Sequence, residues 1–149
     1  MKFSSDTIKK ILVPTDGSDY SIHAAEYAIG IAKAHEAQIT VVFVLDEVVI
    51  DRFTKTTDRE DIERELKGDG ERYTNYILGL AEKAGVKAYP LIVKGRPFEQ
   101  IVHLANGLNV DLIVMGTYGQ RTAERILIGS VAERVIEYAH CPVLVVKQT

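Results

Sequence analysis

The chain has 149 residues, of which 46% are hydrophobic and 26% are charged, and its formal net charge is −3. This size and composition indicate a single globular domain, residues 1–149, with a sizeable buried core. The acidic balance argues against nucleic acid as a partner, and no apolar run approaches the roughly 18 residues of a membrane helix. The single cysteine, Cys141, excludes an internal disulfide and a multi-cysteine zinc site. The N-terminus shows no secretory signal, so we expect a cytoplasmic protein.

Apolar runs and helical stripes alternate along the chain. The runs that predict strands are residues 8–14, 39–45, 86–93, 111–116 and 142–147. Most are dense in Val, Ile and Leu, as is typical of parallel strands covered on both faces. The stripes that predict helices are residues 24–32, 62–84, 98–108 and 131–139. The alternation predicts an α/β fold with one open, mostly parallel five-stranded twisted sheet and helices on both faces.

Two regions fit this pattern less well. Residues 46–60, DEVVIDRFTKTTDRE, are polar and irregular after the first few positions, which predicts a long loop. Residues 67–72, KGDGER, place two glycines inside the second helical stripe. Each glycine in a helix interior costs about 1 kcal/mol relative to alanine. The second helix is therefore expected to be kinked or to begin late.

The first strand leads into the sequence VPTDGS, with Asp16 where the strand ends. In open α/β sheets, ligands bind beyond the carboxyl ends of the strands, at the point where the strand order reverses. If the order is 3-2-1-4-5, that point lies between the first and fourth strands, and Asp16 and Gly116 face one crevice. A carboxylate there can accept hydrogen bonds from ribose hydroxyls. The alternative is that Asp16 only shapes the turn.

The segment MGTYGQRTAERILIGS, residues 115–130, joins the fourth strand to the last helix. Its glycines and the serine that follows them are Gly116, Gly119, Gly129 and Ser130. Glycine lets a ligand approach the backbone closely. Ser130 and Glu133 fit a capping box with Ser130 as N-cap, so the helix is expected to begin at Val131 and to offer its free N–H groups to an anion. The segment predicts a phosphate site, although any one of these glycines could be ordinary turn chemistry.

Together, these motifs resemble a known family. VPTDGS (13–18), VDLIVMGTYG (110–119), the spacing from Gly116 to Ser130, and SVAERVIEYAHCPVLVVK (130–147) are similar to the universal stress protein family, and the similarity runs from Lys9 to Lys147. The resemblance implies a Rossmann-like, HUP-type nucleotide-binding fold with strand order 3-2-1-4-5, usually a homodimer. The 116–130 motif resembles the ATP-binding subgroup, so ATP is the implied cofactor, and Mg²⁺ can accompany it on the phosphates.

The resemblance also implies roles for individual positions. The residues that would border the adenosine are Pro14, Thr15 and Asp16. Those that would line the adenine pocket are Val44 and Met115, and Gly116 would approach the ribose. The phosphates would be held through backbone N–H groups and the serine hydroxyl by Gly119, Gly129, Ser130 and Val131. Arg121 is a weaker candidate for a further phosphate contact.

The main hypothesis is an ATP-binding stress-response regulatory protein, a switch whose bound nucleotide orders residues 116–130 and alters the surface offered to an unidentified protein partner. A slow ATPase or nucleotidyl-transfer enzyme is one alternative. The histidines argue against fast turnover, because all four are expected in structural or surface roles. A nucleotide-free dimeric adaptor is the other alternative, against which the glycine pattern argues. The last strand is apolar and would lie at a sheet edge, which predicts a homodimer contact through Val143 to Val146.

Overall fold

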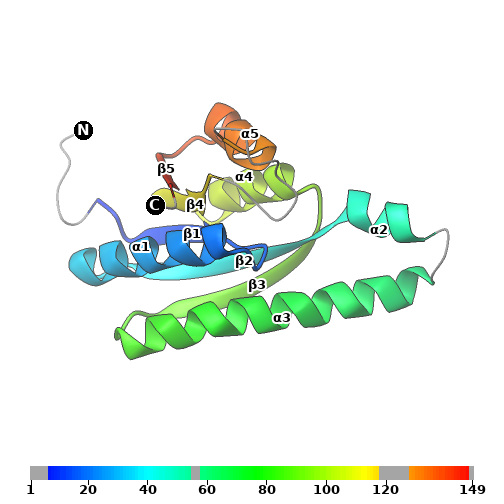
Figure 1. The fold of residues 1–149 in the computed structure, drawn as a ribbon. Coiled ribbons are helices and arrows are strands. Elements are labelled where there is room, and N and C mark those ends of the chain that lie inside the picture. Colours follow the sequence, from blue (N-terminus) through cyan, green and yellow to red (C-terminus); the bar gives the residue numbers. More distant parts are fainter. Residues whose placement is uncertain (1–6, 55–57, 118–127, 148–149) are drawn as a thin grey trace.

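The computed structural model describes residues 7–54, 58–117 and 128–147. Its centre is a five-stranded sheet in the order β3-β2-β1-β4-β5, and every neighbouring pair is parallel (Figure 1). The strands are β1 (Lys10–Pro14), β2 (Gln38–Asp46), β3 (Ala88–Gly95), β4 (Leu112–Gly116) and β5 (Val143–Val146). The predicted α/β class and strand order are confirmed.

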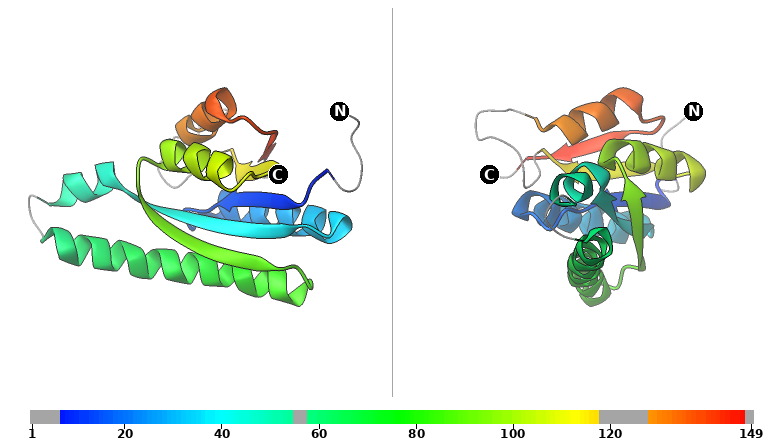
Figure 2. Two further views of the ribbon diagram at one scale, coloured as in Figure 1. Left: turned by 180° about the vertical axis from the view of Figure 1, so that it is seen from behind. Right: turned by 90° about the vertical axis from the view of Figure 1, so that its right-hand side faces the viewer.

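Helices cover both faces of the sheet (Figure 2). They are α1 (Asp19–His35) and α3 (Arg59–Lys83) on one face, and α4 (Pro97–Gly107) and α5 (Ser130–Tyr138) on the other. Side chains alternate along each strand, so Ile11 and Val13 pack toward α1 and α3, while Leu12 packs toward α4 and α5. None of the helices in the described part of the chain is long and apolar enough to cross a membrane.

The prediction of a long loop at residues 46–60 is wrong for most of these residues. A short helix, α2 (Glu47–Phe53), follows β2 directly, and α3 begins at Arg59. The Asp46 carboxylate caps α2 by accepting a hydrogen bond from the backbone N–H of Val48 at 3.0 Å. Ile50 anchors the helix, because its side chain is fully buried. A helix of two turns with one anchoring residue is too short to leave a periodic apolar pattern in the sequence.

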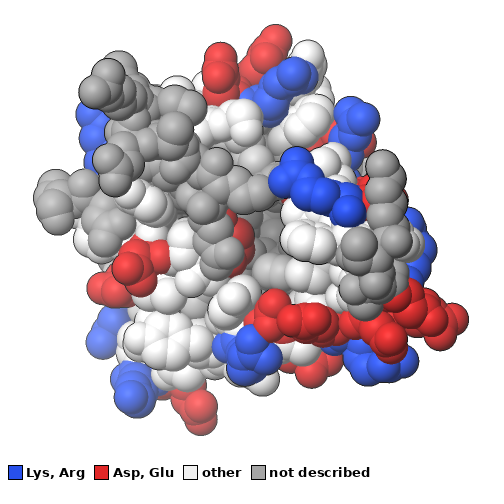
Figure 3. All heavy atoms as spheres, turned by 45° about the vertical axis from the view of Figure 1, so that its right-hand side comes forward, with Lys and Arg blue, Asp and Glu red and all other residues white. Residues whose placement is uncertain are grey.

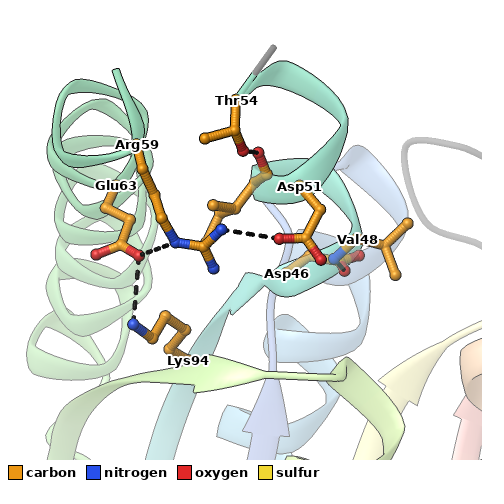
Figure 4. Close-up of polar contacts among 8 residues, drawn as sticks. Asp46, Val48, Asp51, Thr54, Arg59, Glu63 and Lys94 are labelled. Carbon is orange, nitrogen blue, oxygen red and sulfur yellow. Dashed lines mark hydrogen bonds and ion pairs between the residues drawn. The ribbon is translucent and has the colours of Figure 1, made fainter. Parts of the chain in front are cut away.

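Charged side chains join α2 to α3 and β3 (Figure 4). Arg59 Nη1 lies 2.8 Å from Asp51 Oδ1, and Arg59 Nε lies 3.4 Å from Glu63 Oε1. Lys94 Nζ on β3 lies 3.2 Å from the same Glu63 oxygen. Ion pairs as exposed as these typically contribute about 0–1 kcal/mol each. The main support for this end of the molecule is therefore an apolar cluster, here called the α2/α3 cluster, whose buried members are Phe43, Leu45, Ile50 and Ile62.

The two glycines of the second helical stripe do not delay the helix. α3 runs as one helix of 25 residues, with both Gly68 and Gly70 inside it, so the expected late start is wrong. The structure explains only one of the two glycines. An ideal Cβ on Gly70 would lie 2.4 Å from Cδ1 of Phe43, whereas nothing lies within 4 Å of one on Gly68. Gly70 therefore lets α3 approach β2 closely.

This difference makes the two glycines a matched pair for mutation. Gly68→Ala should raise the free energy of unfolding by about 1 kcal/mol, because alanine favours the helix and meets nothing. Gly70→Ala should lower it by about 1–2 kcal/mol, because the overpacking against Phe43 exceeds the same helix gain. Urea denaturation of the three proteins measures both changes. Equal effects of the two substitutions would show that the Phe43 contact is unimportant.

Candidate functional site

The sheet opens between β1 and β4 at their carboxyl ends. β1 pairs with β4 at only two positions, and the last pair is Leu12 with Ile113. With β2, in contrast, β1 stays paired through Pro14 and Val42. The chain leaves β1 toward α1 on one face and follows β4 toward α5 on the other. The strand order reverses at this point, which is where open α/β sheets bind ligands.

The loop from β1 to α1 is held by its own polar side chains. Asp16 Oδ1 accepts a hydrogen bond from the Ser18 N–H at 3.0 Å. Thr15 is buried, its Oγ1 lies 2.9 Å from Ser21 Oγ, and it accepts the N–H of Gly17 at 3.2 Å. Asp16 therefore shapes the turn, and its half-buried side chain is fixed at the end of β1, where the carboxylate could also meet a ligand. Thr15 supports the loop from within.

Gly116, the last residue of β4, packs against the first turn of α1. An ideal Cβ on Gly116 would lie 2.8 Å from the carbonyl oxygen of Tyr20 and 2.9 Å from its carbonyl carbon. Gly116 does not have a positive φ. Its missing side chain is therefore required for the close approach of helix and strand. The sequence offered ligand approach or ordinary turn chemistry as reasons for this glycine, because the contact with Tyr20 becomes visible only in the folded sheet.

The junction between β4 and α5 differs by one residue from the expected capping box. The Gly129 N–H donates to the Thr117 carbonyl at 2.5 Å, and the Gly129 carbonyl accepts the N–H of Glu133 at 3.0 Å. Gly129 is thus the N-cap, with φ −73° and ψ 159°, and Ser130 is the first helical residue. The expectation that Ser130 caps the helix is wrong. Ser130 is exposed and, as the first helical residue, it stands at the first N–H groups of α5, which have no partner within a helix.

Of the remaining expected site residues, Pro14 ends β1, and the others lie on the α4/α5 face or outside the described residues. Met115 is only 5% exposed, and Val44 and Val131 pack around the same apolar cluster. Gly119 and Arg121 lie outside the described residues. Ile128, just before the junction, is half-buried against this cluster.

Within the described part of the chain, the turn at Asp16, the end of β4 at Gly116 and the start of α5 therefore meet at one end of the sheet. The Asp16 turn leads into the first turn of α1, whose Tyr20 contacts Gly116. The next residue, Thr117, holds the start of α5 through Gly129. Sequence reasoning missed both Tyr20 and Thr117, because each acts through its backbone and leaves no side-chain signature.

Other reactive side chains lie elsewhere. His103 on α4 and His140 before β5 are both exposed. Cys141 is half-buried, and burial raises the pKa of its thiol. Among the described residues, no group of three or more His, Cys, Asp or Glu side chains could hold a metal ion. On the face shown in Figure 3, Lys and Arg side chains are interspersed with Asp and Glu.

The model of the universal stress protein family matches residues 7–147. The chain belongs to this family. The universal stress protein MJ0531 of Methanocaldococcus jannaschii is 46% identical to it over 140 residues, which cover 94% of this chain and 82% of that protein.

Solved structures of universal stress proteins and related chains share the fold. The structure of the protein MJ0577 has a TM-score of 0.86 and 32% identity, covering 96% of this chain and 98% of that one. A universal stress protein solved in complex with cAMP has a TM-score of 0.72 and 25% identity, covering 95% of this chain and 98% of that one. The family that the sequence motifs predicted is thus confirmed.

Proposed function

We propose that this universal stress protein binds an adenine nucleotide, and ATP in particular, in the opening between β1 and β4. The observation that supports it most is the junction at Gly129, which places the start of α5 and the exposed Ser130 hydroxyl at the end of β4. A helix start favours an anion through its free N–H groups and its dipole. The related protein in complex with cAMP supports adenine nucleotide as the class of ligand.

In this proposal, each part of the nucleotide meets a different element. The Asp16 carboxylate, fixed at the end of β1, accepts hydrogen bonds from the ribose hydroxyls. The phosphates lie at the start of α5, against the backbone of Val131 and the hydroxyl of Ser130. Gly129 was expected to hold phosphate through its backbone N–H, but that N–H is donated to the Thr117 carbonyl, so Gly129 turns the chain into the helix. Contacts of Gly119 and Arg121 with the phosphates remain part of the proposal. The adenosine borders Pro14 and Thr15, with Val44 and Met115 beneath the base.

The proposed role is regulatory, with nucleotide binding acting as a switch for a protein partner. Any Mg²⁺ would be held mainly by the phosphates, as is usual for this ion in nucleotide sites. Titration of the protein with ATP by calorimetry tests the binding, and mass spectrometry of denatured, freshly purified protein identifies any nucleotide that it retains. A protein that neither retains nor binds adenine nucleotide would contradict the proposal.

Asp16 offers the sharpest test of the proposed pose. Asp16→Ala should weaken ATP binding about 10- to 100-fold, because a hydrogen bond to a charged group is worth about 1.5–3 kcal/mol. Asp16→Asn keeps an oxygen that can accept the Ser18 N–H, so it preserves the turn and removes only the charge. It should weaken binding by about tenfold. Calorimetry measures both affinities.

The control is Asp19→Asn, which removes an exposed carboxylate from the first turn of α1. The affinity of this variant for ATP should stay within about twofold of the wild-type value, because salt screens electrostatic interactions between exposed charges. If Asp16→Ala binds ATP as tightly as the wild type, the carboxylate does not contact the ribose and the pose is wrong.

We also propose that the protein forms a homodimer through β5. β5 is one edge of the sheet, and the residues from Val143 to Val146 are all apolar, three of them half-buried. The opposite edge, β3, includes the exposed residues Pro90 and Lys94, which discourage pairing with another strand. The contrast between the two edges supports β5 as the contact between subunits.

A further inference from the structure

The loop that presents Asp16 is pressed from outside by a side chain of α3. An ideal Cβ on Gly17 would lie 2.5 Å from Cε2 and Cζ of Tyr73 and 2.6 Å from Cε1. The hydroxyl-bearing end of the ring therefore packs against the loop backbone. Gly17 has φ +82°, a left-handed conformation that glycine adopts without strain. Any other residue at position 17 would clash with the ring and strain the backbone.

The Tyr73 ring is held in this position from behind. Its centroid lies 5.9 Å from that of Phe43, with the ring planes at 57°. Phe43 is buried and occupies the space that Gly70 leaves open one turn earlier on α3. Tyr73 also packs against the α2/α3 cluster. The ring is thus wedged between a packed cluster and the loop.

The loop in turn fixes Asp16, the residue proposed to bind the ribose. Gly17 lies between Asp16 and Ser18, whose carboxylate and N–H close the turn at 3.0 Å. We propose that Tyr73 is a positioning residue of the nucleotide site. Its ring holds the turn in the conformation that presents the Asp16 carboxylate, and so couples the docking of α3 to nucleotide affinity. This inference rests on the proposed function.

The coupling is reciprocal. If the docking of α3 through Tyr73 raises the affinity for nucleotide, then bound nucleotide must favour the docking of α3 by the same factor. The surface of α3 and of α2, which packs on it, is thereby linked to occupancy of the site. In the wild type, saturating ATP should slow hydrogen exchange of the α3 amides around Tyr73. The slowing should be lost in Tyr73→Leu.

Two substitutions separate the ring from its hydroxyl. Tyr73→Leu keeps an apolar side chain in the cluster but removes the ring from Gly17. It should weaken binding of both adenosine and ATP by about tenfold, a size typical of residues that act through coupling. Tyr73→Phe keeps the ring and should bind both ligands as the wild type does. Equal losses for adenosine and ATP are expected because the turn serves the ribose and not the phosphates.

Leu66→Ala is the matched control. Leu66 packs on the same α2/α3 cluster, but the three atoms nearest to an ideal Cβ on Gly17 all belong to Tyr73. This substitution should lower the thermal midpoint without weakening nucleotide binding. A second control, Tyr76→Leu, changes an exposed tyrosine on the same helix and should alter neither. The inference is overturned if Tyr73→Leu binds adenosine as tightly as the wild type, or if Leu66→Ala weakens binding equally.

The outcomes distinguish this inference from the function on which it rests. If the wild type binds neither adenosine nor ATP, the proposed function is wrong and the role of Tyr73 falls with it. If the wild type and Tyr73→Leu bind equally well, the nucleotide site stands and only the positioning role is wrong. Loss of binding in Tyr73→Phe as well would point to the hydroxyl and would contradict a role for ring packing.

Discussion

Gly116→Ala should lower the free energy of unfolding by about 3 kcal/mol, the upper end of the usual cost of overpacking. The added methyl group would lie 2.8 Å from the Tyr20 carbonyl oxygen, and backbone atoms of a helix cannot move aside as a flexible side chain can. For a chain of this length, the thermal midpoint should fall by about 6–12 °C. Thermal and urea denaturation of the ligand-free protein measure the change.

Gly30→Ala is the control, because Gly30 lies in α1, the helix that contacts Gly116. Gly30 is exposed, and an ideal Cβ on it meets nothing within 4 Å. The substitution should raise stability by up to about 1 kcal/mol through helix propensity. If Gly116→Ala instead left stability unchanged but weakened nucleotide binding, Gly116 would serve ligand approach and not packing.

The fold class followed from the sequence because the buried strands leave a strong pattern. Strands covered on both faces read as continuous apolar runs, and each predicted run contains most of its observed strand. The residues alone did not determine the strand order, which entered only as an assumption. The family resemblance then implied the order 3-2-1-4-5. Order depends on which strands pair, and pairing of distant segments leaves little trace in local composition.

The parts that the sequence did not predict depend on contacts between distant segments or on short elements. α2 has two turns and one buried anchor, Ile50, so its pattern resembles that of a polar loop. Both Gly129 and Ser130 are residues that commonly cap helices. The hydrogen bond from the Gly129 N–H to the Thr117 carbonyl decides between them, and it forms only when α5 returns to β4.

The candidate site shows the same division. The sequence placed Asp16 and Gly116 at neighbouring strand ends, and the structure brings both there. It did not reveal that Tyr73 packs on Gly17, because α3 reaches the β1–α1 loop only after docking on β2. A local motif can therefore indicate which residues meet a ligand, but not which side chains hold those residues in place.

Val145→Pro should convert the proposed dimer to a monomer. The Ile113 N–H donates to the Pro142 carbonyl, so the alternation of the parallel ladder turns the Val145 N–H away from β4 and toward the open edge. Proline removes this donor and is tolerated on an edge strand. In each copy, the proline would leave a buried acceptor of the partner strand without its hydrogen bond, at a cost of about 1–3 kcal/mol. The two copies together should lower subunit affinity by about 30-fold or more.

Sedimentation at micromolar concentration measures the mass directly. The variant should sediment near the chain mass of 16.5 kDa and the wild type near twice that value. Tyr89→Ser, on the exposed β3 edge, should leave the dimer intact, because that edge is not the proposed contact. Circular dichroism like that of the wild type would show that Val145→Pro still folds. A wild-type monomer, or a Val145→Pro dimer of unchanged affinity, would mean that β5 pairs with no second copy and that its apolar edge serves only the core of its own subunit.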